Sequence, residues 1–243
     1  MKKINSLLLC ILLAATAGVH AQQLVSDAEM ENIRHLKTDW PDLGRFREAN
    51  SIAGFPAPGE NRVVFMGNSI TIGWIEHRPE FFKDKPYINR GISGQTTPQM
   101  LVRFRQDVVD LKPAVVVILA GINDIAGNTG PSSLKMIEDN LASMCEIASA
   151  NNIRVVLCSV LPAWDFPWNQ GSYPASKIRE LNQWIKNYAS EHQHIYLDYY
   201  SHMADERGGL RASLTYDGVH PDAEGYRVME PLLEQAIQKA LGN

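Results

Sequence analysis

The order of hydrophobic and polar positions along the chain predicts strands that alternate with helices. Five short apolar runs, rich in β-branched residues, are separated by segments with helical periodicity. The continuous apolar run 115–119 suits a strand buried on both faces of a parallel sheet. We therefore expect a three-layer α/β/α sandwich around a five-stranded parallel sheet. The expected strands are 62–66, 87–89, 114–120, 153–160 and 195–197, and the expected helices are 26–50, 69–76, 97–109, 131–150, 174–190 and 221–241.

The first residues have the features of a signal peptide. Lys2 and Lys3 precede the apolar run 7–15, and Val19-His20-Ala21 ends in a pattern that signal peptidase accepts. We expect cleavage near Ala21 and export to the periplasm or the medium. The apolar run is too short to anchor the mature chain across a bilayer. Residues 22–243 are expected to form one domain, with 22–60 as a helical extension packed on it.

Composition and charge narrow the class of partner. Hydrophobic residues make up 45% of the 243 and charged residues 21%, as in an average globular protein. Loss of the two lysines with the signal peptide leaves 21 basic residues against 27 acidic ones, a net charge of −6. An acidic chain without a basic run is a poor match for nucleic acid or an anionic membrane surface, and favours a small or neutral molecule. Cys145 and Cys158 are compatible with free thiols or with one disulfide.

Candidate chemistry lies where the predicted strands end, which is where open parallel sheets bind ligands. Ser69 follows the first strand and opens a helix, Gly91 follows the second strand, and Asn123 follows the third. Asp217 and His220 precede the last helix. A serine needs a base to take its proton, and a carboxylate orients that base. The Gly91 amide, the Asn123 carboxamide and the Ser69 amide can stabilise the resulting oxyanion.

Four sequence blocks contain these residues, namely 63–71, 89–94, 121–124 and 217–221. These blocks resemble the SGNH hydrolase superfamily, also called GDSL-type lipases and acylhydrolases. The resemblance covers nearly all of the chain beyond residue 60 and implies a flavodoxin-like sheet. It implies a Ser69 nucleophile, a His220 base, an Asp217 partner, an oxyanion hole from Ser69, Gly91 and Asn123, and no metal or organic cofactor. The chain departs from the family's first block in having Asn68 where Asp is usual, which removes a charge beside Ser69.

Other motifs offer alternatives or are missing. Ser93 is a rival nucleophile, although no helix starts at it to favour negative charge. There is no Gly-x-Ser-x-Gly elbow, no Gly-x-Gly-x-x-Gly motif and no Walker loop, which argues against an α/β-hydrolase fold and against nucleotide binding. His192 and His194 form a pair without further ligands at metal-site spacing, so we expect a solvated pair and no metal site.

An aromatic segment after the fourth strand bears on the substrate. Trp164, Phe166 and Trp168 can form a hydrophobic plug, or Trp164 and Trp168 can wall a pocket for an acyl group or a sugar. We expect an exported serine esterase for carboxylic esters with a short acyl group such as acetate, with a small molecule or a glycan as the alcohol. Thioesterase or lysophospholipase activity is the alternative within the family. A noncatalytic carbohydrate-binding protein on the same fold is the alternative from another class.

Overall fold

A computed structural model describes residues 26–242, and the predicted signal peptide lies outside the described residues. The chain divides into two compact units, one ending at Trp40 and the other running from Pro41 to the C-terminus. In the first unit the described structure is helix α2 (Asp27–Thr38). The expected packing of residues 22–40 on the domain stays a prediction.

The second unit is built on a five-stranded sheet in the order β2-β1-β3-β4-β5, and every neighbouring pair is parallel. This is the flavodoxin-like strand order, and it confirms the predicted fold class. The central strand β1 ends at Gly67, which pairs in register with Gly91 on one side and Leu119 on the other. The strands are β1 (Val63–Gly67), β2 (Tyr87–Gly91), β3 (Val115–Leu119), β4 (Arg154–Cys158) and β5 (Ile195–Leu197).

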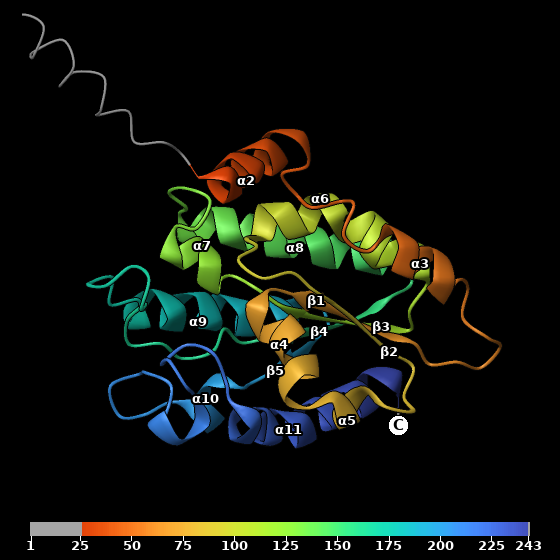
Figure 1. Ribbon diagram of the computed structural model, residues 1–243. Coiled ribbons are helices and arrows are strands. Elements are labelled where there is room, and N and C mark those ends of the chain that lie inside the picture. The colour runs from red at the N-terminus through yellow and green to blue at the C-terminus, as the bar shows by residue number, and fades with distance from the viewer. Residues whose placement is uncertain (1–25, 243) are drawn as a thin grey trace, which may run out of the picture. The chain divides into compact units, whose positions relative to one another are not determined.

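Helices cover both faces of the sheet (Figure 1). One layer contains α6 (Thr97–Asp107), α8 (Leu134–Ala150) and α9 (Ala175–Glu191). The opposite layer contains α4 (Ser69–His77), α5 (Pro79–Phe82), α10 (Tyr200–Met203) and α11 (Ala223–Leu241). The remaining elements are α3 (Arg47–Ala53), α7 (Ile122–Ala126) and the 3₁₀ turns η1 (Val109–Leu111) and η2 (Ala212–Leu214).

The prediction of one helix over 26–50 was wrong. Two helices occupy this stretch, and the non-helical segment between them contains Pro41 and Gly44. Proline lacks the amide hydrogen and its ring obstructs a continuing helix, while glycine loses the most chain entropy in a helix. The short helices α5, α7 and α10 were not predicted, because four or five residues carry too little periodicity to recognise.

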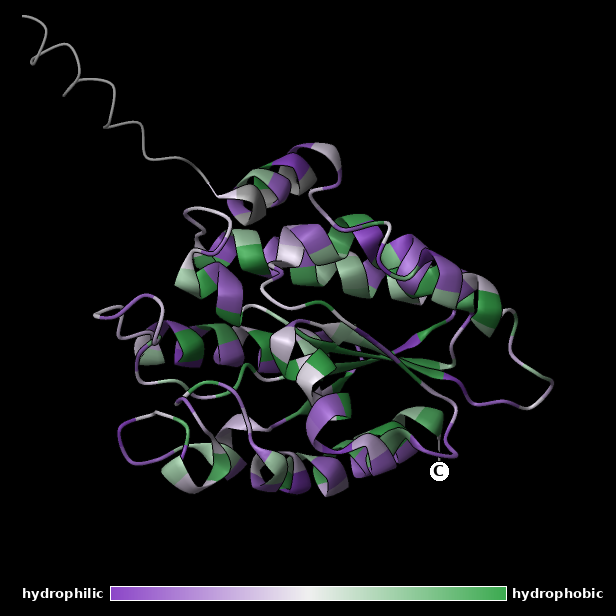
Figure 2. Ribbon diagram, viewed as in Figure 1, coloured by the Kyte–Doolittle hydropathy of each residue, from purple (hydrophilic) through white to green (hydrophobic). Residues whose placement is uncertain are grey.

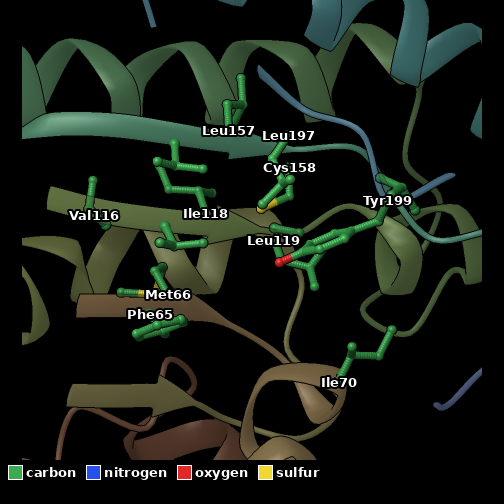
Figure 3. Close-up of a cluster of buried hydrophobic side chains, with 14 of the residues drawn as sticks. Phe65, Met66, Ile70, Val116, Ile118, Leu119, Leu157, Cys158, Leu197 and Tyr199 are labelled. Atoms are coloured by element: carbon green, nitrogen blue, oxygen red, sulfur yellow. The ribbon is translucent and has the colours of Figure 1, made fainter. Parts of the chain in front are cut away.

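The core lies where the sheet meets the two helical layers. Figure 2 shows hydrophobic colouring along the strands and mixed colouring along the surrounding helices, as amphipathic helices require. All residues of β1 and β3 are buried, so the expectation of strands covered on both faces is met. Figure 3 shows Phe65 and Met66 of β1, Val116 and Ile118 of β3 and Leu157 of β4 within this core. Of the helices in residues 26–242, none combines the length and apolar character needed to cross a membrane.

Candidate active site

Ser69 lies at the start of α4, directly beyond the carboxyl end of β1. Asn68 is the N-cap of this helix, and its Oδ1 accepts a hydrogen bond from the Ile70 amide at 3.2 Å. Asn68 therefore keeps a capping oxygen in place of the usual Asp. At the first position of a helix the Ser69 amide is one of the donors without an intrahelical acceptor, and the positive end of the helix dipole favours negative charge there.

His220 and Asp217 meet Ser69 from the segment before α11. The Oγ of Ser69 lies 2.9 Å from Nε2 of His220, and Nδ1 of His220 lies 2.7 Å from Oδ2 of Asp217. The other oxygen of Asp217 accepts from the backbone amides of His220 and Val219 at 2.7 and 2.9 Å. With Nδ1–H donating to the carboxylate, Nε2 is free to accept the Ser69 proton.

The electrostatics of this turn keep the carboxylate charged. Burial would raise the pKa of Asp217, but hydrogen bonds from the His220 amide and ring and from the Val219 amide outweigh it and lower the pKa below its usual value. Thr215 Oγ1 donates to the carbonyl of His220 at 2.6 Å and accepts from the Gly218 amide at 3.0 Å. His220 is therefore held through both its imidazole ring and its backbone.

Two aromatic rings flank the imidazole of His220. The Tyr216 ring is nearly parallel to it, with centroids 5.8 Å apart and 9° between the planes. The Trp168 ring lies 5.9 Å away at 41°. The two rings cover part of the imidazole and limit its rotation. Sequence reasoning missed Tyr216, whose only signal was its position beside Asp217.

Asn123 lies in α7, just beyond β3, with 3% of its surface exposed. Its Nδ2 donates to the backbone carbonyl of Gln95 at 2.9 Å. A carboxamide nitrogen carries two hydrogens, so one orients the side chain and the second remains for a ligand. The sequence did not indicate Gln95 as a partner of Asn123, because the contact is made by the backbone oxygen of Gln95.

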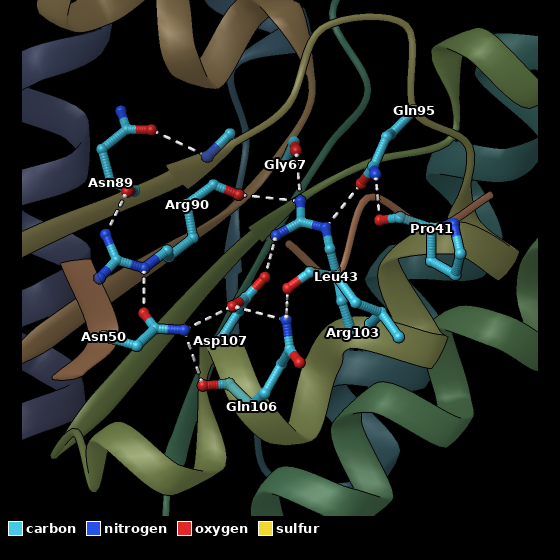
Figure 4. Close-up of polar contacts among 11 residues, drawn as sticks. Pro41, Leu43, Asn50, Gly67, Asn89, Arg90, Gln95, Arg103, Gln106 and Asp107 are labelled. Carbon is cyan, nitrogen blue, oxygen red and sulfur yellow. Dashed lines mark hydrogen bonds and ion pairs between the residues drawn. The ribbon is translucent and has the colours of Figure 1, made fainter. Parts of the chain in front are cut away.

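A buried polar network supports the loop that contains Gln95 (Figure 4). Arg103 is fully buried and donates to Oε1 of Gln95 at 2.6 Å and to Asp107 at 3.1 Å. The same guanidinium donates to the carbonyls of Gly67 and Arg90 at 3.1 and 2.8 Å. It therefore ties the ends of β1 and β2 to the loop after β2. A guanidinium has five donors, which suits one side chain to this bridging role.

The prediction that the Gly91 amide serves the oxyanion hole was wrong. That amide donates to Oδ1 of Asn89 at 2.9 Å, so it is already used. A Cβ at Gly91 would lie 2.4 Å from the amide nitrogen of Ile72 and 2.8 Å from the carbonyl oxygen of Asn68. Gly91 is therefore glycine because the first turn of α4 packs directly on β2. The error arose because Gly91 is the first glycine after the predicted strand 87–89.

Gly94, three residues further along, lies at the site instead. It lines a cavity of about 190 Å³ together with Ser69, Asn123, Asn128, Trp168, His220 and Ser93. Its φ of +77° is a left-handed conformation that favours glycine, and a Cβ there would meet no atom within 4 Å. Among the described residues no hydrogen bond engages the Gly94 amide. The Gly-x-x-Gly pair of Gly91 and Gly94 is visible in the sequence. Only the fold shows that Gly91 packs against α4 and that Gly94 lines the cavity.

The predicted aromatic residues fall into different surroundings. Phe166 is fully buried, whereas Trp164 and Trp168 have 39% and 46% of their surfaces exposed. Trp168 lines the cavity at Ser69, and its Nε1 donates to Oδ1 of Asn128 at 3.2 Å. Trp164 lines a second cavity instead. The plug and the pocket wall are thus formed by different rings of one segment.

The remaining candidates lie elsewhere in the fold. His192 stacks on the ring of Tyr188 and His194 stacks on His192 near the start of β5, whereas the serine site lies beyond the carboxyl ends of the strands. Within residues 26–242, no three His, Cys, Asp or Glu side chains are grouped so that they could hold a metal ion. Cys145 and Cys158 are both buried free thiols, so the structure favours the unpaired alternative.

Comparison with known proteins agrees with this geometry. A sequence model of the family described as GDSL-like Lipase/Acylhydrolase matches residues 65–228, a stretch that runs from β1 into α11. The chain belongs to this family. As a GDSL-type acylhydrolase it is a member of the SGNH hydrolase superfamily, which confirms the resemblance inferred from the four sequence blocks.

Solved structures and curated relatives extend the match. A GDSL-like lipase from Bacteroides thetaiotaomicron is 48% identical, with a TM-score of 0.81 over 83% of this chain and all of that one. A Bacteroides fragilis protein is 49% identical, with a TM-score of 0.82 over 84% of this chain and 99% of that one. The esterase TesA of Pseudomonas aeruginosa is 26% identical over 67% of this chain and 77% of its own length. This acylhydrolase therefore has close structural relatives in the same family.

Proposed function

We propose that this acylhydrolase is a serine esterase that cleaves carboxylic esters through an acyl-enzyme intermediate on Ser69. The observation that carries the proposal is the line of contacts from Ser69 Oγ to His220 at 2.9 Å and on to Asp217 at 2.7 Å, at the wall of a cavity. His220 takes the Ser69 proton as the oxygen attacks the carbonyl carbon. Asp217 holds the imidazole in the required tautomer and stabilises its charged form.

The oxyanion of the tetrahedral intermediate is proposed to bind three donors. These are the Ser69 amide at the helix start, the free hydrogen of the Asn123 carboxamide, and the Gly94 amide in place of Gly91. Each is held before the substrate arrives, the carboxamide by Gln95, so that little reorganisation is needed as charge develops. His220 then protonates the leaving alcohol, and a water activated by the same imidazole hydrolyses the acyl-enzyme.

We propose a short acyl group, with acetate as the best fit. The cavity at Ser69 has about 190 Å³, below the usual range for sites that hold drug-sized ligands. Trp168 narrows it, and the hydrogen bond to Asn128 restrains that ring. An acetylxylan esterase of Geobacillus stearothermophilus is a distant relative, 22% identical over 58% of this chain, which supports carbohydrate as the alcohol.

The test is hydrolysis of 4-nitrophenyl esters of increasing acyl length. We expect activity on the acetate and a steep fall in kcat/KM towards the octanoate. Ser69→Ala should abolish activity, whereas Ser143→Ala, on α8 and hydrogen-bonded to Asp139, should leave it unchanged. Equal rates across acyl lengths would contradict the short-acyl proposal. An inactive wild-type protein that binds glycans would favour the noncatalytic alternative.

Export is part of the same proposal. The charged, apolar and small-residue regions of residues 1–21 support removal of this segment and release from the cytoplasm. One relative, from Bacillus subtilis, is named a lipoprotein and is 35% identical over 45% of this chain. Intact-mass analysis should find a mature chain that begins at or near Gln22, and a cytoplasmic chain that keeps Met1 would contradict it.

A further inference from the structure

A second cavity, of about 520 Å³, is lined by residues of the turn that carries Asp217, the hydrogen-bond partner of the imidazole. Asp217 and Gly218 form part of its wall, while His220 belongs to the smaller cavity at Ser69. Phe166 also lines it, and its ring stacks on Trp168 with centroids 5.3 Å apart. The two cavities are therefore lined by neighbouring residues of the same catalytic turn and the same aromatic segment.

The second cavity presents exposed rings and a cation. Trp164 and Tyr173 lie on its rim with 39% and 59% of their surfaces exposed, and their centroids are 5.7 Å apart at 63°. The guanidinium of Arg207 lies 5.3 Å from the Trp164 ring centroid. This side chain is 66% exposed and pairs with Asp205 at 3.3 Å, which leaves most of its donors free. Flat aromatic rings beside a guanidinium with several free N–H donors suit a ligand that has apolar faces and many hydroxyl groups.

Both rims of this cavity are held rigid by carboxylates. Asp165 accepts from the amides of Gly171, Ser172 and Tyr173 at 2.8, 3.0 and 3.4 Å. The Gly171 hydrogen bond is the main cause that lowers the pKa of Asp165, so this clamp is ionised at neutral pH. Tyr173 has a φ of +42°, a left-handed conformation that is uncommon for a tyrosine. The exposed Tyr173 ring is therefore positioned at the cavity by the backbone conformation that the Asp165 hydrogen bonds hold, and not by burial of the ring.

The opposite rim is built in the same way. Asp205 accepts from the amides of Gly209 and Arg207 at 2.8 and 2.9 Å. A Cβ at Gly209 would lie 3.0 Å from Cβ of Trp164, so the two rims approach closely at this point. A preformed site loses less entropy on binding than one that must be ordered by its ligand.

We propose that this second cavity binds the alcohol part of the ester, and that the alcohol is a sugar residue of an acylated oligosaccharide. The sugar ring packs on Tyr173 and Trp164, and its hydroxyls accept hydrogen bonds from Arg207. The inference rests on the proposed esterase function, because it places the two halves of one ester in the two cavities that residues of the Asp217–His220 turn line. It assigns Trp164 to the sugar and Trp168 to the acyl group.

The test compares two substrates, 4-nitrophenyl acetate and acetylated xylo-oligosaccharides. The variants are Arg207→Ala and Tyr173→Asn, since asparagine tolerates the left-handed backbone. Each should raise KM for the oligosaccharide about tenfold while kcat/KM for 4-nitrophenyl acetate stays within about twofold. The matched control is Arg227→Ala on α11, an exposed arginine paired with Glu224 that does not line this cavity; it should change neither substrate. Melting curves check that each variant is folded.

The outcomes separate this inference from the proposed function. Wild-type activity on 4-nitrophenyl acetate with oligosaccharide kinetics unaffected by both variants would overturn the sugar site and leave the esterase proposal standing. Equal loss on both substrates would also overturn it. If the wild type hydrolyses neither substrate, the esterase proposal fails, and calorimetry of Ser69→Ala with the acetylated oligosaccharide still tests the cavity. Binding must then weaken about tenfold when Arg207→Ala is added, or the sugar site is wrong.

Discussion

Asn123→Ala removes one proposed oxyanion donor. It tests whether the second Nδ2 hydrogen of the carboxamide stabilises the oxyanion. One Nδ2 hydrogen is bound to the Gln95 carbonyl at 2.9 Å, so a single hydrogen is lost from the site. Loss of one such donor costs about 2.7–4 kcal/mol of transition-state stabilisation, or about 10²- to 10³-fold in kcat. KM should change far less, because the donor binds the oxyanion more strongly than the ground-state carbonyl.

The assay is steady-state hydrolysis of 4-nitrophenyl acetate, with Asn128→Ala as the matched control. Asn128 lines the same cavity but is exposed, and its Nδ2 lies 3.4 Å from the Gly94 carbonyl, so its loss should cost less than about tenfold. Asn123→Ala also leaves a buried carbonyl unpaired, which should destabilise the fold by about 1–3 kcal/mol and must be measured separately by thermal melting. A raised KM with unchanged kcat, or equal losses in the two variants, would refute the reasoning.

The other predictions concern packing, specificity and thiol reactivity. Trp168→Ala should extend the accepted acyl length with little loss of stability, whereas Phe166→Ala, at a fully buried ring, should cost about 3–5 kcal/mol in melting experiments. Gly91→Ala should lower the melting temperature and activity together, since its Cβ collides with the α4 backbone; an unchanged melting temperature would contradict the packing role. Burial raises the pKa of Cys145 to about 12 and that of Cys158 further, so iodoacetamide at mildly alkaline pH should modify both only after denaturation, as mass spectrometry would reveal.

The sheet could be predicted because its strands are buried on both faces, and burial on both faces leaves a continuous apolar run in the sequence. The break between α2 and α3 was missed even though Pro41 stands within it. The site residues Ser69, Asn123 and His220 could be listed from the sequence because each follows a strand or precedes a helix at the binding edge.

What could not be predicted depends on contacts between distant segments. Gly91 and Gly94 are three residues apart, and only the packing of α4 decides which one touches the site. A buried Arg103 is unexpected from residue type, because arginine is almost never fully buried unless its donors are paired. Similarly, no sequence motif marks Arg207 as a binding residue. It contacts Trp164 only because folding brings together two loops that are far apart in the sequence.

The most direct test of the account is covalent labelling of the active serine. A fluorophosphonate probe reacts with a serine that a neighbouring base has activated, and the modified peptide is found by mass spectrometry. The 2.9 Å contact with His220 predicts a single adduct on Ser69, absent in Ser69→Ala and strongly reduced in His220→Ala. An adduct on Ser93, or continued ester hydrolysis by Ser69→Ala at wild-type rates, would contradict Ser69 as the nucleophile.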